Sequence, residues 1–433
     1  MSKLIVLSMD ALIYEDLAKL EKMPNFAWLM ENGARANRLK CIYPTLTYPC
    51  HTTMASGCYP DKHGITNNSL AKPGIKDLPW NWTHENVKVK DLFDAAKAAG
   101  LTTAAVGWPV TGNHPSIDYE VDEIWAYGED KSMAAWEKAF LDTGTTRELY
   151  DAVVSRYMPL RVKRHQPESL RFLINCACDI ITLYQPDLLM IHPANIDHYR
   201  HVSGVFSDMV DKGLVECDGA LGQIIAACQA AGTLEDTDIV VTSDHGQLDL
   251  SRMIRPNVLF RENRLIDVDE NGNVIDWQAW CYPVGMSAQV HLKNPSDKAV
   301  YDKVYSLLNS WCATGLHGIE RVFTADEVEK EYRLAGDFTF YLESDGYTKF
   351  DIDWDGPYCV SFPIKLANAE KASHGFLPEK GPRPVLLGCG PHFRKGAILE
   401  DAHLVDGAPT YAKILGVELS DADGRALTEL LNE

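Results

Sequence analysis

Short apolar runs alternate with longer amphipathic segments along most of the chain. Five runs predict buried strands: Leu4–Ser8, Thr102–Val106, Leu188–His192, Ile239–Thr242 and Val385–Gly388. The segments Val89–Ala99 and Met209–Ala231 carry apolar residues at helical spacing, and Gly100 and Gly232 follow them as stop signals. Strands that alternate with helices predict an α/β fold, with a mainly parallel sheet covered by helices on both faces.

Residues 249–373 differ from the rest of the chain in the pattern of secondary structure that they predict. They combine a hairpin signal, two strand-like runs and a helical stretch, namely Asn271–Gly272, Ala288–Leu292, Phe338–Leu342 and Ala299–Trp311. This mixture predicts a smaller α+β unit that packs over one edge of the main sheet. We therefore expect a catalytic α/β core formed by residues 1–248 and 374–433, with residues 249–373 as an inserted α+β cap.

The composition is that of a globular protein and narrows the choice of partners. The 433 residues are 46% hydrophobic and 24% charged, with a formal net charge of −20. Such an acidic chain is unsuited to nucleic-acid polymers or anionic membranes, which attract clusters of Lys and Arg. The apolar stretch Leu4–Leu7 is too short for a signal-peptide core. We expect a soluble cytoplasmic protein, and the sequence does not indicate an oligomeric state.

The eleven cysteines form no framework pattern. Cys176 and Cys178 lie in a C-x-C sequence within an apolar, helical segment. We interpret them as buried, reduced thiols, which is the common state of free cysteine in a cytoplasmic protein.

Five short segments contain side chains that can bind metal ions, and four of them lie at or just after a predicted strand. Their candidate residues are Asp10, Thr47, Asp197, His201, Asp244, His245 and His374. Taken singly, each has a simpler explanation, because Asp10 or Thr47 could cap a helix and Asp197 could pair with His201 one helical turn later. Open α/β sheets, however, place their sites at the carboxyl ends of strands.

Together, these side chains indicate a chemistry that none of them indicates alone. Three Asp, three His and one hydroxyl suit two borderline-soft divalent ions. Two ions about 4 Å apart can hold the attacking and leaving oxygens of a phosphoryl transfer. Thr47 stands between Pro44 and Pro49, which restrict its backbone, and metal coordination is a standard means of activating an alcohol as a nucleophile.

The sequence resembles the nucleotide pyrophosphatase/phosphodiesterase family of the alkaline phosphatase superfamily. The resemblance rests on a set of motifs in matching order: Leu7–Asp10, Pro44–Pro49, Gly57–Ile65, Asp197-x-x-x-His201, Ser243–Gly246 and His374–Gly375. It implies an alkaline phosphatase-like fold and hydrolysis of a small-molecule phosphodiester or nucleotide.

The resemblance also implies roles for individual residues. One zinc ion would be held by Asp10, Asp244 and His245, with Thr47 reaching the same ion. The other would be held by Asp197, His201 and His374. Manganese or another divalent transition metal could replace zinc. Thr47 would form a covalent phosphothreonine intermediate, which water activated on the second ion would then hydrolyse.

Three further positions contact the substrate in the family. Asn68 falls where a side-chain amide binds a phosphate oxygen, and Tyr48 where an aromatic ring packs against the leaving group or base. His192 falls where a tyrosine often helps to clamp a nucleotide base. Cys50 also departs from the family, which commonly has Asn there.

Two alternatives share the same metal core: a phosphonoacetate hydrolase-like enzyme and a phosphomonoesterase. A monoesterase of the alkaline phosphatase kind would favour a Ser nucleophile followed by Arg, which Thr47–Tyr48 does not provide. We expect Arg200, in the turn between Asp197 and His201, to lie on the solvated face of its helix. A metal-stabilised binding protein without catalysis would need a missing ligand or nucleophile, and all seven positions are filled.

Overall fold

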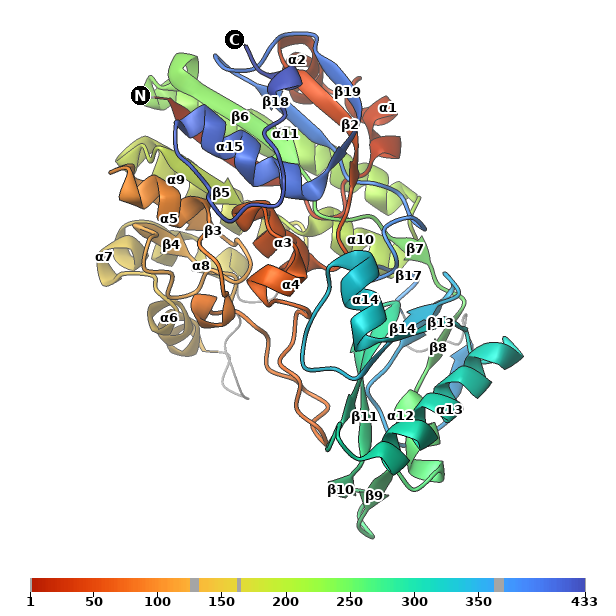
Figure 1. Ribbon diagram of the computed structural model, residues 1–433. Helices are drawn as coiled ribbons and strands as arrows, with labels where there is room; N and C mark the ends of the chain where they lie inside the picture. Colours follow the sequence, from red (N-terminus) through yellow and green to blue (C-terminus); the bar gives the residue numbers. More distant parts are fainter. Residues whose placement is uncertain (1, 125–131, 162–164, 362–369, 433) are drawn as a thin grey trace.

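The computed structural model describes residues 2–124, 132–161, 165–361 and 370–432. A sheet of eight strands forms its centre (Figure 1). In sheet order these are β19 (Ile398–His403), β2 (Ala34–Lys40), β18 (Leu386–Cys389), β6 (Thr237–Thr242), β1 (Lys3–Ser8), β5 (Leu188–Ile191), β3 (Thr103–Val106) and β4 (Tyr119–Val121). Only β18 runs antiparallel to its neighbours. The five predicted strands and the mainly parallel sheet are confirmed.

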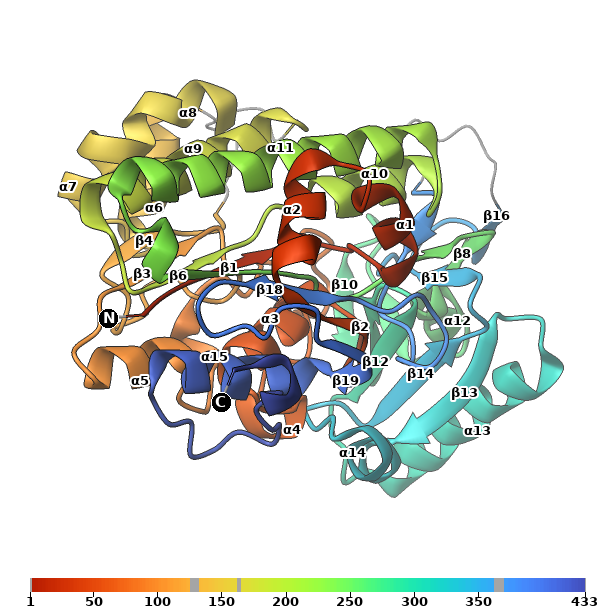
Figure 2. The same ribbon diagram turned by 90° about the horizontal axis from the view of Figure 1, so that it is seen from above.

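Helices cover both faces of this sheet (Figure 2). One face carries α2 (Pro24–Asn32), α9 (Glu168–Tyr184) and α11 (Asp208–Ala231), and the other carries α3 (Thr47–Ser56), α5 (Leu92–Ala98) and α15 (Gly407–Leu415). Side chains along β1 alternate between the two cores, with Ile5 and Leu7 in the first and Leu4 and Val6 in the second. Within the described residues, no helix is both long and apolar enough to cross a membrane.

The chain between β6 and β18 builds a second lobe beside the main sheet (Figure 1). Its largest sheet contains β11 (Ala279–Val284), β12 (Ser287–Leu292), β14 (Phe340–Ser344) and β13 (Ile319–Thr324), covered by α13 (Lys298–Thr314). Strands β9 (Ile266–Val268) and β10 (Val274–Trp277) form an antiparallel hairpin around Gly272, whose φ is +82°. The small additional sheets agree with the expected α+β character, and the predicted domain boundaries stay a prediction.

Arg200 lies in α10 (Asn195–Ser203) but not on its solvated face. The side chain is fully buried, its guanidinium pairs with Asp16 at 2.5 Å, and its Nε donates to the Ala11 carbonyl at 3.2 Å. The prediction for Arg200 is therefore wrong. The segment after β1 folds over this side of α10, which is a tertiary contact that helical spacing alone does not reveal.

Arg200→Met is expected to destabilise the protein by about 3–5 kcal/mol, because it leaves the buried Asp16 carboxylate without its cation. Urea denaturation would measure the change. Lys138→Met, which removes an exposed partner of Asp142, is a matched control and should leave the midpoint nearly unchanged. Equal midpoints for the wild type and Arg200→Met would contradict a stabilising role for the pair.

Candidate active site

The centre of the site follows from the register of two neighbouring strands. β1 and β6 are parallel, and Ser8 is paired with Thr242. Asp10 and Asp244 each come two residues later, so both carboxylates emerge at the same edge of the sheet. The next residue, His245, directs Nε2 between them, 3.2 Å from Asp244 Oδ2 and 3.7 Å from Asp10 Oδ1.

A second group of side chains comes from α10 and from the end of β17 (Ala372–Ser373). Asp197 and His201 are one helical turn apart, and His201 Nε2 lies 3.3 Å from Asp197 Oδ1. His374 follows β17 and places Nε2 3.7 Å from the same oxygen. His374 also stacks on His245 with ring centroids 3.9 Å apart, which joins the two groups.

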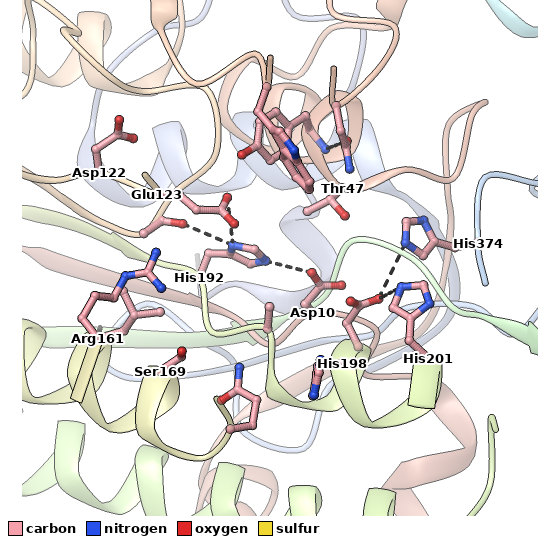
Figure 3. A pocket seen from close by; sticks show the side chains of 18 residues that line it. Asp10, Thr47, Asp122, Glu123, Arg161, Ser169, His192, His198, His201 and His374 are labelled. Atoms are coloured by element: carbon pink, nitrogen blue, oxygen red, sulfur yellow. Dashed lines mark hydrogen bonds and ion pairs between the residues drawn. The ribbon is translucent and has the colours of Figure 1, made fainter. Parts of the chain in front are cut away.

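The structure thus brings together all seven side chains that the sequence singled out. Figure 3 shows Asp10, Thr47, His201 and His374 around the pocket. In each of two sets of three residues, the atoms that could bind a metal ion lie within 4.8 Å of one another. The sets are Asp10, Asp244 and His245, and Asp197, His245 and His374. His245 belongs to both sets, so the division of ligands between two ions stays a prediction.

The hydrogen bonds of two histidines suit metal binding. His201 Nδ1 donates to the Ala372 carbonyl at 2.8 Å, and His374 Nδ1 donates to the Thr45 carbonyl at 3.2 Å. Both rings therefore direct Nε2 towards Asp197. Outer hydrogen bonds of this kind fix the tautomer of metal-binding histidines. Burial also lowers the pKa of His374 to about 3, so this ring is neutral at physiological pH.

The buried carboxylates need positive charge nearby. Asp10 Oδ1 and Asp244 Oδ2 are buried and lack a hydrogen-bond partner within the described part of the chain. Burial, together with the charges of Asp197 and Asp244, raises the pKa of Asp10 well above its usual value. Burial also tends to raise the pKa of Asp197, but the neighbouring His201 holds that pKa below its ordinary range. Divalent cations would compensate this cluster of like charges, so the residues fit a metal centre.

Thr47 is the first residue of α3 and faces the candidate metal-binding residues. Its Oγ1 lies 3.2 Å from His245 Nε2. The nearby Thr45 has a different environment, because its hydroxyl donates to the Phe376 carbonyl at 2.9 Å and accepts from the Gly375 amide at 3.1 Å. Thr45 therefore fastens the loop that contains His374, whereas Thr47 presents its hydroxyl to the site.

The three predicted substrate-contacting residues also line this pocket. The Tyr48 backbone amide donates to Asn68 Oδ1 at 2.9 Å. This bond orients the Asn68 side chain so that the two hydrogens on Nδ2 can donate to another acceptor. The Tyr48 ring is fully buried and meets the Trp80 ring edge-on at 5.4 Å. His192 Nε2 lies 3.1 Å from Asp10 Oδ2.

The pocket has a volume of about 210 Å³ and extends away from Thr47 towards residues that the sequence analysis missed. These include Trp80, Asp122, Glu123, Arg161 and Ser169. Asp122 and Glu123 come directly after β4, so the strand-end argument would have found them if β4 had been recognised. Gln247 was also missed, although it follows Asp244-His245-Gly246, and its Nε2 donates to Asp197 Oδ1 at 2.5 Å.

Residues 4–376 match the family model for type I phosphodiesterases/nucleotide pyrophosphatases. The chain belongs to this family. Among family relatives, human ectonucleotide pyrophosphatase/phosphodiesterase family member 5 is 24% identical over 271 residues, covering 62% of this chain and 47% of that protein. Venom phosphodiesterase 2 of Crotalus adamanteus is 24% identical over 413 residues, covering 91% of this chain and 43% of that protein. The chain spans about half the length of the curated relatives it matches.

Solved structures of the family share the fold. Human family member 5 superposes with a TM-score of 0.70 at 17% identity, covering 100% of both chains. An inactive threonine-to-alanine variant of the murine protein, in complex with AMP, has a TM-score of 0.67 at 18% identity and also covers 100% of both chains.

Metal-free protein should bind about two zinc ions per chain and release protons at pH 7. Burial opposes the charged form of His201, but Asp197 raises the pKa of His201 to about 9. At pH 7 this ring is therefore protonated and must lose its proton to bind metal, and this contribution disappears above about pH 9. Metal analysis and calorimetry in buffers of different ionisation enthalpy would measure both quantities. A single octahedral, all-oxygen site, or binding without proton release, would contradict the assignment.

Proposed function

We propose that the protein is a two-metal phosphodiesterase of the nucleotide pyrophosphatase type, with Thr47 as the nucleophile. The observation that carries this proposal is the position of Thr47 Oγ1, 3.2 Å from His245 Nε2 and beside the buried carboxylates. Family membership supports it. The inactive murine relative, which differs from its wild type by a threonine-to-alanine change and binds AMP, supports both the nucleophile and the class of substrate.

The two ions would be held by the seven residues brought together at the sheet edge. Zinc fits this mixture of imidazole and carboxylate better than magnesium does, and manganese or another divalent transition metal is the alternative. When bound, the ions would lower the pKa of the attacking hydroxyl and neutralise charge on the transferring phosphoryl group.

The side chains of the protein then position the reacting atoms. Thr47 Oγ1 attacks phosphorus, the bond from phosphorus to the leaving oxygen breaks, and a phosphothreonine forms. Water cleaves this ester and restores the Thr47 hydroxyl. Asn68 is turned by the Tyr48 amide so that Nδ2 can donate to a phosphoryl oxygen. A donor that is already oriented before the reaction stabilises the transition state without further reorganisation.

The shape of the pocket favours a small phosphodiester or a nucleotide. Trp80 forms an aromatic wall with Tyr48 beside Asn68, and the pocket continues towards Ser169 and Arg161. Figure 3 shows Arg161 on the side of the pocket away from Thr47, and its guanidinium donates to the Ile124 carbonyl. An aromatic wall next to a hydrogen-bond donor for the phosphate suits a leaving group or ester group that carries an aromatic ring.

Thr47→Ala is expected to reduce kcat by at least about 10³-fold, because it removes the oxygen nucleophile. Thr47→Ser should keep measurable activity, since the hydroxyl survives. Mass spectrometry of acid-quenched enzyme should find a phosphoryl group on Thr47 in the wild type and in Thr47→Ser. Near wild-type rates for Thr47→Ala, with metal content unchanged, would show that the nucleophile lies elsewhere.

An aryl phosphodiester should be hydrolysed with a higher kcat/KM than the corresponding aryl monophosphate. A monoester dianion brings an additional charged oxygen, which usually needs a further cation near the nucleophile. Arg200 does not supply one, because it is buried against Asp16, and Arg161 lies across the pocket. Paired assays on one preparation would decide. A monoester preferred by tenfold or more, equivalent to about 1.4 kcal/mol, would favour the monoesterase alternative.

A further inference from the structure

His192 is held beneath the pocket by contacts on every side. It follows the fully buried strand β5, its amide donates to the Val106 carbonyl at 3.1 Å, and its side chain is only 2% exposed. The Nε2 atom lies 3.1 Å from Asp10 Oδ2, and Nδ1 lies 3.2 Å from the Gly107 carbonyl. The ring also packs edge-on against His51, with centroids 4.1 Å apart. These contacts leave the imidazole one orientation.

The surroundings of Asp10 make this contact important. Among the described residues, His192 Nε2 is the nitrogen within hydrogen-bonding distance of Asp10 Oδ2, and Asp10 Oδ1 accepts no hydrogen bond. Asp244 Oδ1 accepts from the Ala11 amide at 3.2 Å, and Asp197 Oδ1 accepts from Gln247. Asp244 also accepts from Ser243 Oγ at 3.4 Å, and Asp197 Oδ1 also lies 3.3 Å from His201 Nε2. The donor that orients the Asp10 carboxylate is the His192 imidazole.

We propose that His192 is a positioning residue for Asp10. Its Nε2–H donates to Asp10 Oδ2 and turns Oδ1 towards His245 Nε2, which lies 3.7 Å away. This inference rests on the proposed metal centre. It assigns His192 an effect through Asp10 and not through contact with a nucleotide base, because both ring nitrogens already contact protein oxygens. The aromatic wall of the substrate pocket is then left to Trp80, which the buried Tyr48 ring supports edge-on.

Outer hydrogen bonds to metal ligands have measurable effects on metal affinity. Loss of such a bond typically weakens metal binding by roughly 10- to 100-fold. A freed Asp10 carboxylate would also rotate, so the reaction would slow even when metal is saturating. The substrate does not touch this bond, and its KM should therefore change little.

Two substitutions of His192 separate these effects. His192→Phe keeps the ring shape but removes both nitrogens, and His192→Gln keeps an amide N–H near the position of Nε2. Zinc affinity is measured without substrate, by competition with a chromogenic chelator. We expect His192→Phe to weaken one of the two zinc sites by roughly 10- to 100-fold and His192→Gln to restore most of that loss. At saturating zinc, kcat should fall in His192→Phe while KM for an aryl diester stays within about twofold.

His291→Phe is the matched control. His291 is half-buried and packs edge-on against the Tyr282 ring with centroids 5.0 Å apart, but it neither lines the pocket nor belongs to the candidate metal-binding groups. The zinc affinity of His291→Phe should equal that of the wild type. If His192→Phe does not fold, His192→Met provides an apolar side chain that adapts its shape.

Three outcomes decide the inference. Unchanged zinc affinity in His192→Phe would overturn it, and a raised KM alone would show that His192 contacts the substrate. A loss of affinity that His192→Gln does not restore would also overturn it, because the effect would then come from packing. Zinc affinity is measured without substrate, so this test does not depend on diesterase activity. If the protein does not hydrolyse diesters, the proposed function fails but the role of His192 can still hold. If the protein hydrolyses diesters, the role of His192 can still be refuted.

Discussion

The close approach of three carboxylates at one edge of the sheet, two of them buried and the third partly buried, is the constraint on which this structure depends. Asp10, Asp197 and Asp244 are brought within a few ångströms of shared histidine nitrogens. Like charges in a desolvated site repel one another, and the raised pKa of Asp10 reflects this. The described residues around them supply too few donors to satisfy all their oxygens. The arrangement is stable as a cation-binding centre, which is why we infer that metal ions belong to the folded, active protein.

The second lobe completes this centre, because it positions His374. The backbone next to His374 crosses the β11–β12 turn so closely that a Cβ on Gly285 would lie 2.1 Å from the His374 carbonyl. Gly285 and Gly375 both have positive φ, so glycine meets the steric and conformational requirements of this crossing. The Met286 amide donates to the same carbonyl at 2.8 Å. A histidine far along the chain from Asp197 is thereby held beside it.

The positions that depart from the family now have physical explanations. His192, where a tyrosine is often found, is tied to Asp10, and this contact turns a pocket position into part of the support for the metal centre. Cys50 lies one turn after Thr47 and contacts Cys41, with sulfurs 3.3 Å apart and both side chains buried. Both changes lie behind the reacting groups and leave Thr47 and Asn68 exposed to the pocket. The chemistry of the family can therefore be retained while the surroundings of the phosphate differ.

The sequence by itself determined the parallel sheet and the residues that meet at its edge. Strand periodicity located β1 and β6 and placed Asp10 and Asp244 just after them, and the observed parallel pairing of the two strands then brings the carboxylates together. Contacts between distant segments were decided only by the tertiary structure. The burial of Arg200 against Asp16 and the hydrogen bond from His192 to Asp10 join parts of the chain more than 180 residues apart. Local periodicity reports which face of an element is apolar, but it does not report which polar group of another element lies opposite that face.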